Sequence, residues 1–87
     1  MPSVFIPAQL RDLTGGVGEV EVEAGTVREA VAALEERFPG IAARLCREDE
    51  LAPDLQVSID GRMSTRGLRA KLEPQSELHF LPALGGG

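Results

Sequence analysis

Alternating apolar and polar residues predict two strands near the start of the chain. Residues 3–7 place Phe5 on one side of a strand and its two aliphatic neighbours on the other, and a proline is expected to end this strand. Residues 19–23 alternate valine with glutamate, which is typical of a half-buried strand. Residues 8–14 are interpreted as a short helical turn or an extended loop, with glycines after them. This pattern favours a hairpin with a long connection.

The clearest helix signal begins at Thr26. Its hydroxyl and the Glu29 carboxylate are spaced as a capping box, in which threonine accepts from the third helical amide and glutamate accepts from the N-cap amide. A proline and a glycine at 39 and 40 are expected to end this helix. Apolar residues recur along one face, at Val27, Ala30, Val31, Leu34 and Phe38. This face should pack on the sheet.

The second half of the chain predicts a shorter helix and two further strands. These elements are a helix over 41–46, a charged loop over 47–50, a strand over 55–60, a turn at 60–61 and a final strand over 77–81. Leu78 and Phe80 should face inward from the final strand. Residues 63–72 are interpreted as irregular, with Leu68 and Leu72 as core anchors.

This order of elements predicts an α+β fold, in which one main helix packs on a mixed sheet of four to five strands. We expect residues 1–87 to form a single domain, with residues 82–87 as a tail. Hydrophobic residues make up 43% of the chain and aromatic residues 3%, so the core must be mainly aliphatic.

Charge and composition exclude several function classes. The net charge of −5 argues against nucleic-acid binding, because no basic face is evident to displace counterions from phosphates. No apolar run is long enough to cross a membrane, and no signal peptide is recognised, so we expect a cytoplasmic protein. Cys46 is the only cysteine, which excludes an internal disulfide and a cysteine zinc cluster.

The last stretch of the chain, residues 77–87, runs from a strand into proline, two small apolar residues and three glycines. Pro82 cannot donate a ladder hydrogen bond, so the strand should leave the sheet there. Glycines hold a single conformation poorly, which predicts a thin, flexible tail ending in a free carboxylate. From these residues alone, the tail is either a reactive end or a frayed one.

The chain resembles the ubiquitin-like β-grasp sulfur carriers (ThiS/MoaD-like), which include the thiamin carrier, the carrier of one cysteine route and the small subunit of molybdopterin synthase. The resembling segments are residues 7–16 (PAQLRDLTGG), 25–31 (GTVREAV), 38–41 (FPGI), 60–61 (DG) and 80–87 (FLPALGGG). The leucine–arginine pair at 10–11, the glycines near 15 and the loop after 41 are most similar to the cysteine-route carrier.

The resemblance implies that the chain has no catalytic site and binds no cofactor of its own. A partner similar to the ubiquitin-activating enzymes would use ATP to adenylate the Gly87 carboxylate, and sulfur would then replace AMP to leave a thiocarboxylate. Gly86 and Gly85 would let the tail pass through a narrow channel, because a side chain there would clash. Further implied partners are a sulfur-acceptor biosynthetic enzyme, for cysteine, thiamin or another metabolite, and a protease or hydrolase acting on the C-terminus.

Three alternatives stay open. Against the interpretation as a sulfur carrier, the chain could instead be a molybdopterin synthase small subunit, a modifier joined to lysines through Gly87, or an interaction module with an inert tail.

Docking of partners is expected on residues that lie out of phase with the inward positions. Phe5, His79 and Leu81 would form an exposed apolar patch, with Leu84 contributing from the tail. Alternatively, residues 63–72 cover one or more of them. His79 is interpreted as a surface histidine and Cys46 as a buried small hydrophobe, while the glutamates at 19, 21 and 23 and the acidic pair at 49 and 50 are interpreted as solvated rather than cation-binding.

Overall fold

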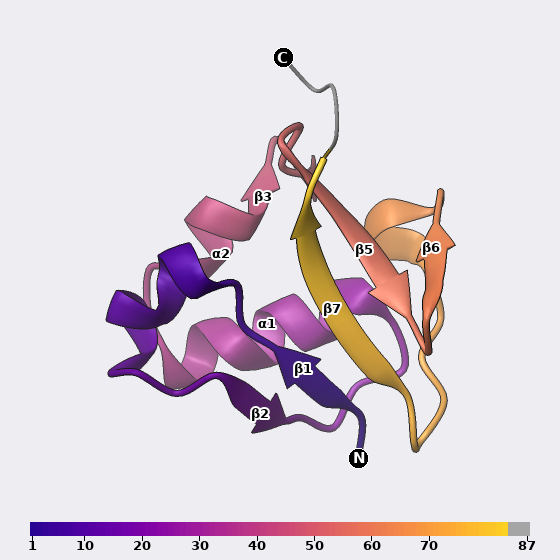
Figure 1. The fold of residues 1–87 in the computed structure, drawn as a ribbon, viewed down its shortest axis with the longest axis horizontal. Coiled ribbons are helices and arrows are strands. Elements are labelled where there is room, and N and C mark those ends of the chain that lie inside the picture. The colour runs from indigo at the N-terminus through magenta and orange to yellow at the C-terminus, as the bar shows by residue number, and fades with distance from the viewer. Residues whose placement is uncertain (84–87) are drawn as a thin grey trace.

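A computed structural model of the chain describes residues 1–83 and shows a five-stranded mixed sheet with helices on one face (Figure 1). The sheet order is β2-β1-β7-β5-β6. Its strands are β1 (Ser3–Phe5), β2 (Glu19–Glu21), β5 (Leu55–Ile59), β6 (Arg62–Ser64) and β7 (Glu77–Pro82). Neighbouring strands are antiparallel except for β1 and β7, which are parallel. This architecture confirms the predicted α+β β-grasp fold.

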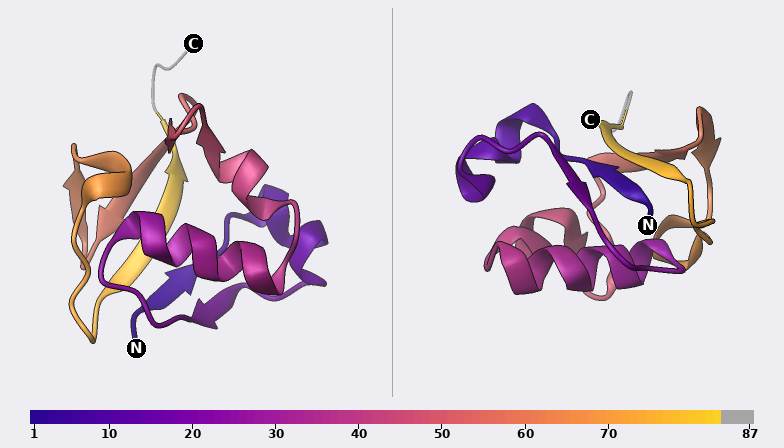
Figure 2. Two further views of the ribbon diagram at one scale, coloured as in Figure 1. Left: turned by 180° about the vertical axis from the view of Figure 1, so that it is seen from behind. Right: turned by 90° about the horizontal axis from the view of Figure 1, so that it is seen from below.

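Helix α1 (Val27–Arg37) covers one face of the sheet, as the two views of Figure 2 show. It begins where predicted, because the Thr26 hydroxyl accepts a hydrogen bond from the Glu29 amide at 3.2 Å. The Glu29 carboxylate, however, accepts from the Gly25 amide at 2.7 Å rather than from the N-cap amide. The cap is therefore present, but its return bond reaches one residue further back than a capping box predicts.

The core lies between α1 and the sheet and is almost entirely aliphatic. Phe80 is its only buried aromatic side chain among the described residues, and Leu68 and Leu72 anchor the segment before β7, as predicted. Phe38, at the C-cap of α1, is half-buried, and the Arg37 guanidinium lies over its ring. The largest fully buried side chains are those of Ile6, Leu34, Ile41, Leu45, Leu78, Val4, Val27 and Val57.

The short elements complete the fold. The connection between β1 and β2 contains a 3-10 helix, η1 (Ala8–Thr14), and a second one, η2 (Gly67–Arg69), follows β6. Helix α2 (Ile41–Leu45) follows α1 as predicted.

Two regions differ from the sequence-based expectation. The charged loop at 47–50 contains a small hairpin, β3 (Cys46–Arg47) with β4 (Glu50–Leu51), whose turn residues Glu48 and Asp49 have φ of 51° and 66°. Arg28 stabilises this turn by pairing with the Asp49 carboxylate and donating to its carbonyl.

The second difference is β6, in a region expected to be irregular. The turn before it has positive φ at Asp60 (53°) and Gly61 (84°), as a two-residue hairpin requires. The Asp60 carboxylate accepts hydrogen bonds from the Glu77 amide at 2.9 Å and from the buried Ser76 hydroxyl at 3.1 Å. These bonds tie the turn to the start of β7, so the hairpin extends the sheet by one edge strand.

Candidate functional site

The end of β7 is held in place up to Ala83. Pro82 pairs with Leu55 across the sheet, and the Ala83 amide donates to the Asp54 carbonyl at 2.9 Å. The Gln56 side-chain amide donates to the Pro82 carbonyl at 3.0 Å. The root of the predicted tail is therefore fixed on β5, and Pro82 ends the strand as expected. The predicted site residues Leu84, Gly85, Gly86 and Gly87 lie outside the described residues.

One face of the sheet carries the residues expected to dock partners. Phe5 and His79 are in register on the parallel strands β1 and β7, and their rings are stacked, with centroids 4.1 Å apart and planes at 4°. Both side chains are half-buried, as is Leu81 two residues further along β7. Helix α1 lies on the opposite side of the sheet (Figures 1 and 2). The structure thus brings the three residues together on one face.

Met63 belongs to the same face, although sequence reasoning placed it in an irregular segment. It pairs with Ser58 on β5, and Ser58 pairs with His79 on β7, so the cross-strand row continues from Phe5 to Met63. Its side chain is 52% exposed. The 63–72 segment begins as a sheet edge rather than as a cover over this face. A strand of three residues placed directly after the aspartate–glycine turn would have predicted the position of Met63 on the sheet.

In residues 1–83, no group of three or more histidine, cysteine or acidic residues is placed to hold a metal ion. His79 stacks on Phe5 rather than facing a carboxylate. Cys46 is half-buried, and desolvation raises the pKa of its thiol, so little thiolate is present at neutral pH.

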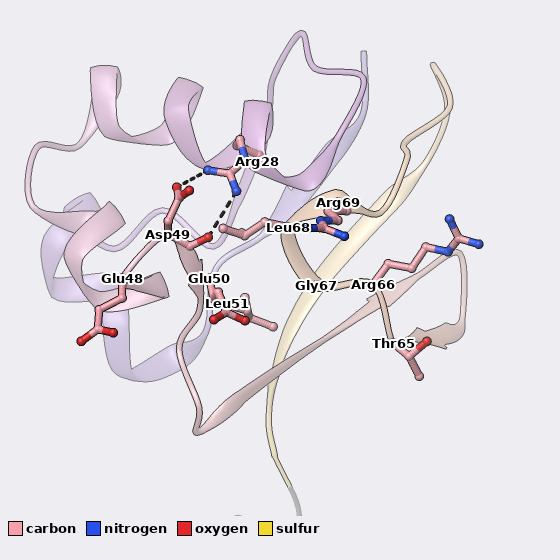
Figure 3. A pocket seen from close by; sticks show the side chains of 10 residues that line it. All are labelled: Arg28, Glu48, Asp49, Glu50, Leu51, Thr65, Arg66, Gly67, Leu68 and Arg69. Carbon is pink, nitrogen blue, oxygen red and sulfur yellow. Dashed lines mark hydrogen bonds and ion pairs between the residues drawn. The ribbon is translucent and has the colours of Figure 1, made fainter.

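A groove separates the β3–β4 hairpin from η2 (Figure 3). One wall carries the acidic residues at 48–50 and the other carries Arg66 and Arg69. Arg28 lies at the groove and pairs with Asp49. Nothing in the sequence pattern pointed to this groove, because its walls come from segments about 15 residues apart.

None of the helices in the part of the chain that the structure describes is both long and apolar enough to span a membrane.

Comparisons with known proteins place this geometry in a family. The model of the ThiS family matches residues 4–87. No curated protein matches the chain by sequence. A chain in the crystal structure of the Amycolatopsis orientalis BexX/CysO complex is similar over 100% of both chains, with 36% identity and a TM-score of 0.90.

Two further solved structures are similar along most of their length. Mycobacterium tuberculosis CysO, described as an antigen, shares 25% identity with a TM-score of 0.86, over 97% of this chain and 100% of that one. The small archaeal modifier protein 1 of Haloferax volcanii shares 25% identity with a TM-score of 0.72, over 95% of this chain and 97% of that one.

The fold, the fixed root of the tail and the family match agree. Proteins of this family are sulfur carriers without a catalytic role, which confirms the sequence-based interpretation of the chain as a carrier rather than an enzyme. The chain belongs to the ThiS family of β-grasp sulfur carriers and is similar to CysO.

Proposed function

We propose that the Gly87 carboxylate is the group that carries sulfur. The observation that carries this proposal is the family match, which runs through the terminal glycines to residue 87. The structure supports the proposal as well, because hydrogen bonds hold the chain in place to the end of β7 and at Ala83, four residues before Gly87 in the sequence. A carrier needs this division between a rigid body and a reactive end.

The chemistry takes two steps. A Gly87 carboxylate oxygen attacks the α-phosphorus of ATP on a partner enzyme, and pyrophosphate leaves to give an acyl-adenylate. A hydrosulfide then attacks the acyl carbon, and AMP leaves with the former carboxylate oxygen to give a thiocarboxylate. Activation is needed because a free carboxylate has no good leaving group. The thiocarboxylate then donates sulfide on the acceptor enzyme, and the carboxylate is regenerated by hydrolysis.

The carrier contributes position rather than catalysis. Gly86 and Gly85 give the tail passage into the partner's site. Phe5, His79 and Leu81 form the docking face, extended by Met63 on the same side of the sheet. Leu84 adds a contact from the tail. ATP is bound and used by the activating enzyme.

Cysteine biosynthesis is the pathway that we propose, with thiamin or another sulfur-containing metabolite as alternatives. The similarity to CysO over the full length supports cysteine. The acceptor is therefore a biosynthetic enzyme, and a CysO structure already holds a second protein, BexX. A role as small subunit of molybdopterin synthase remains an alternative, and stable co-purification with a larger catalytic subunit would favour it.

A second candidate function rests on the similarity to a small archaeal modifier protein. A modifier would use the same activated Gly87 but transfer it to a lysine amine of another protein. The two functions share the adenylation step and differ in the acceptor. Isopeptide-linked conjugates of the chain in its host would favour the modifier.

Deleting Gly87 tests the proposal. The deletion moves the carboxylate back by one residue, about 3.5 Å, although the chain still ends in two glycines. Because a misplacement of about 1 Å can cost 100-fold in rate, we expect at least that loss in ATP–pyrophosphate exchange with the host's activating enzyme. The melting temperature should not change.

Deleting Met1 is the matched control. Strand β1 is parallel to β7, so its start lies at the opposite end of the sheet from Ala83. This variant should exchange pyrophosphate at the wild-type rate. Equal activity of the Gly87 deletion and the Met1 deletion would overturn the assignment of Gly87.

A further inference from the structure

The positive charges of this acidic chain are segregated. Four of its nine basic residues lie between positions 62 and 71, where no acidic residue occurs. We call Arg62, Arg66, Arg69 and Lys71 the basic cluster. This segment carries a charge of +4, while the rest of the chain carries −9. Such a distribution creates a local positive potential on a molecule whose overall field is negative.

The four side chains are exposed and lack ion-pair partners within residues 1–83, where the only salt bridge joins Arg28 and Asp49. Three members of the basic cluster, Arg62, Arg66 and Lys71, surround one hollow under the edge strand β6. Ser64 and Thr65 add hydroxyl groups to the same hollow. The hollow therefore offers several hydrogen-bond donors and positive charges to one anionic group.

The fold itself does not require this charge. Leu68 and Ala70 anchor the segment in the core, while the cationic residues around them point to solvent. Charge on an edge strand protects against edge-to-edge pairing, which accounts for Arg62. It does not account for Arg69 and Lys71, which lie beyond the strand. Because like charges placed close together repel one another and lower stability, folding alone does not explain the basic cluster, and we look for its role in binding.

The middle of the basic cluster, at Arg66, lies toward the end of the sheet where the tail begins, whereas Arg62 is in register with Ile59 and Leu78 and lies toward the other end. Strands β6 and β7 both pair antiparallel with β5, so they run in the same direction. The chain after Ser64 therefore emerges at the end of the sheet where β7 reaches Ala83. Four extended residues span at most about 14 Å, so an enzyme that holds the Gly87 carboxylate must cover this end of the domain.

We propose that the basic cluster docks an acidic surface of the enzyme that activates the C-terminus. This inference rests on the proposed function and names the chemistry of its partner. A protein is favoured over nucleic acid, because the −9 charge outside the segment would repel a phosphate backbone at any wider contact. The acidic wall at 48–50, across the groove from Arg66, restricts the contact to the β6 side.

The test compares two charge reversals in the full-length chain. Arg66→Glu changes the basic cluster, and Arg44→Glu makes the same charge change on α2. The measurement is the KM for the carrier in ATP–pyrophosphate exchange, at low salt and at about 0.5 M NaCl. Thermal melts confirm that both variants are folded.

We expect Arg66→Glu to raise the KM at low salt by about tenfold over Arg44→Glu, with kcat unchanged. The difference should shrink at high salt because the interaction is between exposed charges. Equal KM values for the two variants, or a lower kcat at unchanged KM, would overturn the docking role while leaving the proposed function intact. If the wild type itself were not activated, the proposed function would fail first. The docking role would also be overturned if the wild type bound duplex DNA at physiological salt and Arg66→Glu abolished this binding. The basic cluster would then be a nucleic-acid site.

Discussion

Glu35 shows how a single side chain can join two helices. Its carboxylate accepts hydrogen bonds from the Ala42 amide at 2.9 Å and from the Gly40 amide at 3.0 and 3.1 Å, and so bridges the end of α1 to the start of α2. Gly40 has φ of 103°, which glycine adopts without strain. The Ala42 and Gly40 bonds, in that order, lower the pKa of Glu35 below its ordinary value of 4.5.

This lowered pKa predicts a pH-dependent contribution to stability. A carboxyl group with a depressed pKa in the folded state stabilises the protein above its unfolded pKa, and the contribution is lost as the pH falls. We therefore expect Glu35→Gln to be less stable than the wild type at pH 7, with a difference that shrinks as the pH falls below about 4.5. Urea unfolding of both proteins between pH 7 and pH 3 measures it. A difference that stays constant over this range would contradict the role of the charge.

The sequence did not reveal Glu35, since its two amide partners are five and seven residues away, beyond a proline–glycine turn. Their approach depends on the angle between α1 and α2, which no local pattern encodes. Phe5 and His79 were recognised as facing outward, because strand alternation is local. Their stacking was not, because it depends on the parallel register of β1 and β7.

Helix α1 was predictable as an element because its signals agree. The threonine cap, the apolar stripe and the proline–glycine stop all point to one helix, and the structure gives Val27–Arg37. We expect Thr26→Ala to lower the free energy of unfolding by about 1 kcal/mol, since the Glu29 amide loses its acceptor. Chemical denaturation measures this, with Thr26→Ser as the control that keeps the hydroxyl.

The tail chemistry should be independent of this cap. Thr26→Ala should therefore exchange pyrophosphate at the wild-type rate at temperatures where it is folded. A loss of activation comparable to that of the Gly87 deletion would mean that the helix takes part in activation.

The elements that sequence reasoning missed are the shortest. Strand β6 has three residues, and β3 and β4 have two each, too few to show a period. The turn between β3 and β4 places Glu48 and Asp49 at positive φ, where glycine or asparagine is usual. The turn is held from outside by Arg28. Because β6 was not predicted, the position of Met63 on the same face as Phe5 and His79 was not predicted either.

At the scale of the whole molecule, residues 1–83 form the described domain, and the carboxylate that we propose to carry sulfur comes four residues later in the sequence. The described residues present two surfaces, the face of the sheet with Phe5 and His79 and the basic cluster at and after the edge strand β6. Sequence order and spacing were enough for the fold and the family, because β-grasp elements are few and regularly placed. The surfaces were not predictable in full, since they assemble residues from strands that meet only in the sheet.

The central claim is that Gly87 carries sulfur as a thiocarboxylate. The most direct test is the intact mass of the full-length protein after incubation with ATP, the host's activating enzyme and a sulfide source. The account predicts a species in which one oxygen is replaced by sulfur, and fragmentation should place the sulfur on Gly87. A protein that keeps its unmodified carboxylate while the enzyme activates a known carrier would contradict the claim.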